Sequence, residues 1–263
     1  MNRQLVVFLL LGFAISWGID AFIITQKVQP GPIIILAMWG PGLAAIITSL
    51  WFNKTIKPLS FTLKKPSYLL AGYLLPLLYA VPVYLAIWLF GFADFNKGFT
   101  CSYLAFFTLG QLQQLFAAFG EEIGWRGVLY PQLSKKFSKF NAALLTGIIW
   151  AVWHYPLIIF NDHDGPLLWY VLSCFSLMII SLSFLMAWLR DKSGNIWPAV
   201  LLHASHNFYV LVFLDNLTNP SPYRSYMYGE TGLGLAISTF VIASLLWLKH
   251  DRSIVETKPQ LAV

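Results

Sequence analysis

Apolar runs long enough to cross a membrane recur along the whole chain, and they constrain the fold more than any other feature. Short polar or Pro- and Gly-containing stretches separate eight such runs, at residues 5–24, 31–52, 68–91, 101–130, 141–160, 167–189, 196–214 and 232–248. A helix needs about 20 apolar residues to cross a bilayer, where helices also satisfy their own backbone hydrogen bonds. The sequence therefore predicts an all-α polytopic membrane protein with a bundle of about eight transmembrane helices.

The composition supports lipid as the solvent. Hydrophobic residues make up 58% of the chain and charged residues only 11%, whereas soluble domains carry about 25% charged residues. A length of 263 residues suffices for eight spans with short connections. We therefore expect a single membrane domain over residues 1–263. The net charge of +6 is read as a topology signal, and no nucleic-acid partner is expected. The sequence leaves the oligomeric state open.

The distribution of Lys and Arg predicts the orientation in the membrane. With eight spans, all but three of the 17 basic residues fall on the side that holds both termini, and the exceptions are Lys27, Lys97 and Arg224. Cytoplasmic loops are enriched in Lys and Arg. We therefore predict that both termini are cytoplasmic. The short loops and compact size favour a bacterial plasma membrane.

Three ionisable residues lie inside the run at 101–130, at a cost of roughly 3 kcal/mol each on insertion scales. Glu122 and Arg126 are four residues apart, which places them on one helix face and predicts a structural ion pair. Glu121 lies about 100° around the helix, on a polar stripe with Gln114, and has no partner built into the motif. This stripe predicts an intramembrane polar cavity in which Glu121 acts as a general base. The alternative is a purely structural network of Glu121, Glu122 and Arg126.

Two further apolar runs, at residues 141–160 and 196–214, contain histidines. His154 is followed by Pro156, which removes one backbone hydrogen bond, and His203 lies four residues before Asn207 on one helix face. An Asn in this position can fix the tautomer of a His or orient a substrate carbonyl. Together, Glu121, His154 and His203 could hold a divalent metal or activate water directly. The sequence has no H-E-x-x-H motif, so the usual zinc-protease helix is absent. It also has no G-x-S-x-G motif, which argues against a serine-type intramembrane protease.

The three segments together resemble the CPBP family, which includes CAAX proteases and bacteriocin-processing enzymes and is also called the Abi family. Its pattern is Glu-Glu-x-x-x-Arg, Phe-x-x-x-His and His-x-x-x-Asn on successive membrane helices. Here these motifs are Glu121 to Arg126, Trp150 to His154 and His203 to Asn207. The resemblance covers a core at about residues 101–215. Trp150 stands where the family usually has Phe, which preserves an aromatic wall.

The resemblance implies an intramembrane metalloendopeptidase, a hydrolase acting on a peptide or lipidated protein substrate in the bilayer. Glu121 and His154 would activate water, while His203 and Asn207 would stabilise the oxyanion. The family is classed as metallopeptidases, so we expect a divalent metal, zinc. Family members cleave prenylated CAAX C-termini, or process peptides and confer immunity in bacteria.

Two other functions remain open from the sequence. Glu121, His154 and His203 could form the relay of an ion-coupled transporter, although no inverted repeat is visible. A non-catalytic immunity or scaffold protein could retain the polar cluster for its structure alone. The discriminating residue is Glu121, because a scaffold would tolerate the nearly isosteric change Glu121→Gln.

Helix arithmetic gives one further expectation. At 1.5 Å per residue, Glu121 lies about 30 Å along its helix from residue 101, and His154 about 20 Å from residue 141 on the opposite side. The two side chains reach the same depth only if the helix at 101–130 is strongly tilted or begins outside the membrane.

Overall fold

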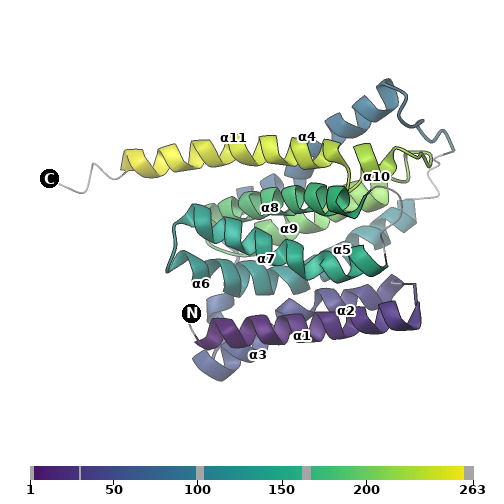
Figure 1. The fold of residues 1–263 in the computed structure, drawn as a ribbon. Coiled ribbons are helices and arrows are strands. Elements are labelled where there is room, and N and C mark those ends of the chain that lie inside the picture. The colour runs from purple at the N-terminus through teal and green to yellow at the C-terminus, as the bar shows by residue number, and fades with distance from the viewer. Residues whose placement is uncertain (1–2, 30, 99–103, 162–166, 258–263) are drawn as a thin grey trace.

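The chain forms a bundle of helices in the computed structural model, which describes residues 3–29, 31–98, 104–161 and 167–257 (Figure 1). These residues contain no β-strand, as the sequence predicted. The helical elements in order are α1 (Arg3–Gln26), η1 (Gly31–Ile33), α2 (Ile34–Met38), α3 (Gly40–Asn53), η2 (Lys57–Leu59), α4 (Ser67–Leu89), α5 (Leu104–Gly124), η4 (Trp125–Leu129), α6 (Tyr130–Ser134), α7 (Lys139–Phe160), α8 (Leu168–Ser193), α9 (Trp197–Asn207), η5 (Phe208–Leu214), α10 (Arg224–Met227) and α11 (Leu233–Thr257).

Within the described residues, six helical segments are long and apolar enough to cross a membrane: Arg3–Gln26, Gly31–Asn53, Ser67–Leu89, Lys139–Phe160, Leu168–Ser193 and Trp197–Leu214. Two further predicted spans are also helical. The polar stripe lowers the hydropathy of α5, and α11 has a shorter apolar stretch at Leu233–Lys249. Large apolar side chains such as Leu10, Trp51 and Leu89 lie on the outside of the bundle, where lipid would cover them.

The helices pack in layers that place the motif-bearing segments in the middle. Helix α1 packs on α3, α3 on α5, and α5 on α9, while α7 packs on α8 and α4 packs on α9. Figure 1 shows that α1 begins and α11 ends at the same end of the bundle. A chain that crosses the membrane an even number of times begins and ends on the same side. The predicted cytoplasmic location of that end and the bacterial origin remain predictions.

Small residues allow the central helices to approach closely. A Cβ atom added to Gly42 of α3 would lie 2.4 Å from the carbonyl oxygen of Gly120 in α5. One added to Gly72 of α4 would lie 2.3 Å from the carbonyl oxygen of Pro198 in α9. The hydrophobic effect does not drive helices together within lipid. Membrane helices therefore associate through van der Waals packing at such close crossings. These two crossings bring α5 and α9, which carry the acidic and His-Asn motifs, into the centre.

The helix that carries the acidic motif continues beyond the predicted end near Tyr130. The π-helical segment η4 follows α5, and α6 then runs to Ser134 with Pro131 in its first turn. A proline is tolerated there because an N–H group in the first turn needs no helical partner. Tyr130 keeps helical dihedral angles before the proline because its side chain is buried, and its hydroxyl donates to Asp191 Oδ2 at 2.7 Å.

The crossing of α3 and α5 can be tested with two matched substitutions. We expect Gly42→Ala to lower the free energy of unfolding by about 1–3 kcal/mol, because the added methyl group overlaps backbone atoms. Gly18→Ala makes the same chemical change in α1, where no atom lies within 4 Å of the added Cβ. Its thermal unfolding midpoint in detergent should equal or exceed that of the wild type. Equal midpoints for the two variants would contradict the close crossing.

Candidate functional site

The acidic motif lies at the end of α5, fully buried in the bundle. Glu122 Oε1 is 2.9 Å from Arg126 Nη1, and both side chains are 0% exposed. The i,i+4 spacing that predicted this contact thus places the two groups within hydrogen-bonding distance. Segment η4 begins directly after α5 and contains Arg126. Such π turns occur frequently at functional sites in helices.

The neighbouring carboxylate has partners that the motif alone did not reveal. Glu121 Oε2 accepts hydrogen bonds from the indole nitrogens of Trp125, at 3.1 Å, and Trp150, at 2.7 Å. Glu121 Oε1 is buried and has no hydrogen-bond partner among the residues that the structure describes. Two neutral donors therefore fix one oxygen of the carboxylate, while its other oxygen can accept a hydrogen bond from a molecule that enters the site.

His203, on α9, lies next to the carboxylates of both Glu121 and Glu122. Its Nδ1 lies 3.0 Å from Glu122 Oε1, and its Nε2 lies 4.0 Å from Glu121 Oε1. Because a carboxylate only accepts, Nδ1 carries the proton that it donates to Glu122. Nε2 then faces Glu121 across a gap that is too long for a hydrogen bond, yet one water molecule could contact both atoms.

The third motif residue, His154, is oriented by its own helix. Its Nδ1 lies 2.9 Å from the carbonyl oxygen of Trp150, so this nitrogen is the donor and Nε2 keeps its lone pair. The rings of Trp153 and Phe175 pack edge-on against the imidazole, with centroids 4.6 and 5.1 Å away. Trp150 therefore supports two residues at once, since its indole holds Glu121 and its carbonyl holds His154.

The end of α9 differs in detail from the expectation. Asn207 does not fix the tautomer of His203, because Glu122 occupies the Nδ1 position. The Asn207 amide instead donates to Gln114 Oε1 at 3.2 Å, which leaves one of its two hydrogens unused in this bond. The π-helical segment η5 begins immediately after Asn207. Both polar motifs on α5 and α9 are thus followed by a π turn.

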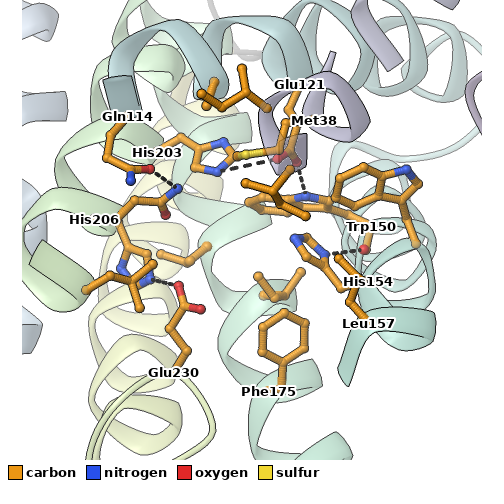
Figure 2. A pocket seen from close by; sticks show the side chains of 18 of the residues that line it. Met38, Gln114, Glu121, Trp150, His154, Leu157, Phe175, His203, His206 and Glu230 are labelled. Carbon is orange, nitrogen blue, oxygen red and sulfur yellow. Dashed lines mark hydrogen bonds and ion pairs between the residues drawn. The ribbon is translucent and has the colours of Figure 1, made fainter. Parts of the chain in front are cut away.

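The four predicted site residues line one cavity of about 200 Å³, namely Glu121, His154, His203 and Asn207 (Figure 2). Helices α5, α7 and α9 supply them, so the depths of Glu121 and His154 agree despite the helix arithmetic. Apolar side chains, including Met38, Leu157 and Phe175, complete the wall. The apolar walls lower the local dielectric, so charges in the cavity interact more strongly than they would in bulk water.

The sequence reasoning missed several polar residues of this cavity. Asp20 of α1 is buried and lines it, although it lies in the middle of an apolar run where the same rule would have flagged it. Glu230 also lines the cavity, but it comes from the segment between α10 and α11, where a carboxylate gives no signal. Nothing in the chain pattern shows that this segment turns inward.

The arrangement does not match the predicted metal site. In the described part of the chain, no group of three or more His, Cys, Asp or Glu side chains could hold a metal ion. Zinc ligand atoms lie about 2.0–2.2 Å from the metal in a tetrahedral site. Such a site brings ligand atoms closer together than the 4.0 Å between Glu121 Oε1 and His203 Nε2. The zinc ion remains a prediction, and no step of the proposed reaction depends on it.

The buried ion pair can be tested by removing one partner. We expect Arg126→Ala to destabilise the protein by about 3–5 kcal/mol, because Glu122 would remain buried without its cation. Lys139→Ala is the control, since Lys139 is 46% exposed and pairs with Asp191 at 2.9 Å. That pair should contribute at most about 1 kcal/mol. Unfolding in detergent measures both, and a normal midpoint for the Arg126 variant would contradict the ion-pair argument.

Comparison with known proteins agrees with the motifs and the geometry. The family described as type II CAAX prenyl endopeptidase, Rce1-like, matches residues 103–209. A protein named CAAX prenyl protease 2, from Methanococcus maripaludis, is 36% identical over 95 residues, which are 34% of this chain and 35% of that protein. The chain thus matches about a third of the length of this relative. Both matches agree with the resemblance to the CPBP family, and the family match spans residues 103–209, which carry all three motifs.

Proposed function

We propose that this protein is an intramembrane endopeptidase that hydrolyses peptide bonds of membrane-associated, CAAX-like substrates. The observation that carries the proposal is the Glu121 carboxylate. One of its oxygens is held by two indoles, and the other faces His203 Nε2 across 4.0 Å in a cavity that His154 also lines. The relative named CAAX prenyl protease 2 supports the same class of substrate.

In the proposed reaction, Glu121 acts as the general base. Water between Glu121 Oε1 and His203 Nε2 gives a proton to the carboxylate as its oxygen attacks the scissile carbonyl carbon. When His203 is protonated on both nitrogens, its Nε2–H donates to the oxygen of this water, and the lone pair on His154 Nε2 can then accept the second hydrogen of the water and orient it. A positioned general base accelerates such steps by about 10²–10⁴-fold.

The oxyanion that forms needs hydrogen-bond donors, and α9 supplies two. Asn207 has one amide hydrogen that is not used by Gln114, and His203 donates from Nε2 when that nitrogen is also protonated. Donors aimed at the developing charge in a dry site are a large source of catalysis. When the tetrahedral intermediate collapses, the C–N bond breaks, and the proton held by Glu121 passes to the leaving amine.

The proposal is tested by cleavage of membrane-anchored and prenylated peptides in liposomes. We expect Glu121→Gln and His154→Ala each to reduce kcat/KM by at least about 100-fold, because each removes a group that binds or activates the water. Asp94→Asn is the matched control, since it removes an exposed carboxylate that does not line the cavity. Full activity of the Glu121 variant would mean a contaminating protease or a different site, whereas no product from any of the proteins would favour the scaffold.

A second test concerns Trp150, which stands where the family usually has Phe. Trp150→Phe keeps a ring but removes the donor 2.7 Å from Glu121 Oε2. Hydrogen bonds to charged groups contribute about 1.5–3 kcal/mol, so kcat should fall by about 10–100-fold with little change in KM. Trp169→Phe is the control, because its side chain is 66% exposed. Wild-type kcat in Trp150→Phe would show that Glu121 does not need this donor.

A further inference from the structure

Glu230 lies outside the membrane-spanning helices, in a turn between two glycines that directs its carboxylate into the cavity. Glu230 lies between Gly229, which has a φ of +74°, and Gly232, where an added Cβ would lie 2.4 Å from the Tyr228 nitrogen. A side chain at either position would strain this turn. The backbone N–H of Gly232 donates to the Gly229 carbonyl at 3.1 Å and closes it. The turn is thus built to hold Glu230 in one place.

A polar relay from α4 and α9 orients this carboxylate. The Tyr79 hydroxyl lies 2.9 Å from His206 Nδ1, and His206 Nε2 lies 3.4 Å from Glu230 Oε1. A neutral imidazole that accepts from the tyrosine carries its proton on Nε2, facing the carboxylate. This arrangement holds Glu230 without requiring a full positive charge beside it. Figure 2 shows His206 and Glu230 across the cavity from His154 and Trp150.

The charge on Glu230 is favoured in this place. Burial raises the pKa of the Glu230 carboxyl. Contact with His206 and the proximity of His154 and His203 lower it, and the net effect is a pKa below the ordinary value. Its side chain is 27% exposed and lines the same cavity as Glu121, so a group that enters the cavity can reach it. Glu230 is therefore an accessible anion on the wall opposite the catalytic group.

The cavity as a whole carries acidic but no basic lysine or arginine side chains. Its lining, among the described residues, includes Asp20, Glu121 and Glu230 and neither Lys nor Arg. Arg126 lies behind the wall and is paired with Glu122. A cleft lined by charges of one sign concentrates its potential and attracts the opposite charge. Such a cavity favours a cationic group and opposes an anionic one.

We propose that Glu230 is a specificity residue that binds a Lys or Arg side chain of the substrate. This inference rests on the proposed peptidase function and names the side-chain class that the cavity selects. Within the cavity lining Glu230 contacts the His206 imidazole but no Lys or Arg, and a basic substrate side chain would supply a full positive charge next to it. His206 and Tyr79 act as positioning residues that hold the carboxylate ready.

Binding is measured first, on the Glu121→Gln background, so that no turnover is needed. The probes are fluorescent membrane-anchored peptides that are identical except for Lys, norleucine or Glu, scanned through the positions that flank the expected cleavage point. We expect the Lys peptide to bind about tenfold more tightly than the norleucine peptide at one position, and the Glu peptide more weakly than both. Adding Glu230→Gln should abolish the Lys preference, whereas adding Asp94→Asn should preserve it.

Charge reversal provides the second measurement. Glu230→Lys should invert the order, so that the Glu peptide binds more tightly than the Lys peptide, which a merely structural role of Glu230 could not produce. A Lys preference that is absent, or that survives Glu230→Gln, overturns the proposal. Cleavage of the norleucine peptide by the otherwise wild-type protein tests the peptidase function separately. Failure of that cleavage with an intact Lys preference would overturn only the proposed reaction.

Discussion

The buried contact of Glu122 with Arg126 and His203 is the interaction on which the site depends. Removing three ionisable groups from water is costly, and only mutual pairing makes the arrangement tolerable in a bundle surrounded by lipid. One oxygen, Glu122 Oε1, receives both Arg126 at 2.9 Å and His203 at 3.0 Å. The Arg126 guanidinium also lies 4.6 Å from the ring centroid of Trp150. The same network therefore joins α5, α7 and α9, the three helices that bear the motifs.

This network gives two adjacent carboxylates different surroundings, which underlies the proposed division into a structural Glu122 and a catalytic Glu121. Glu122 is occupied by cationic and imidazole partners, whereas Glu121 is held only by two indole N–H groups on one oxygen. Neutral donors orient a carboxylate without giving it the full counter-charge that an arginine would supply. Sequence neighbours thus receive different roles because α5 turns them by about 100° toward different helices. The Trp at position 150 adds an indole donor where the family usually has a Phe.

The helices around the cavity are held by close backbone contacts and by irregular turns. Gly42 and Gly72 admit neighbouring backbones, which sets the positions of α5 and α9. Segments η4 and η5 come directly after Glu121–Gly124 and Asn207. A π turn inserts an extra residue into the helix and re-aims the side chains beyond it. Glu230 lines the same cavity as Glu121 but lies outside the helices of spanning length.

The sequence alone determined the features that are local along the chain. Apolar runs gave the helices and the all-α class, because hydropathy over about 20 residues decides what enters a bilayer. The spacing of Glu122 and Arg126 placed them in contact, because helix geometry brings residues four apart onto one face. Likewise, the three motifs were enough to reveal the resemblance to the CPBP family, with which the partial matches agree. The predicted end at Tyr130 was wrong because a π turn and tertiary burial accommodated Pro131.

Only the tertiary structure decided which groups meet between helices. The two indoles on Glu121, the Glu122 contact of His203 and the Gln114 contact of Asn207 join residues distant in the chain. The inward turn at Glu230 brings its carboxylate within 3.4 Å of His206, whose other ring nitrogen contacts Tyr79. None of these contacts can be derived from periodicity, because helix crossing angles and depths are set by packing at small residues across the bundle. The sequence pattern therefore determines which helix faces are polar. Packing of the helices determines which polar side chains face one another.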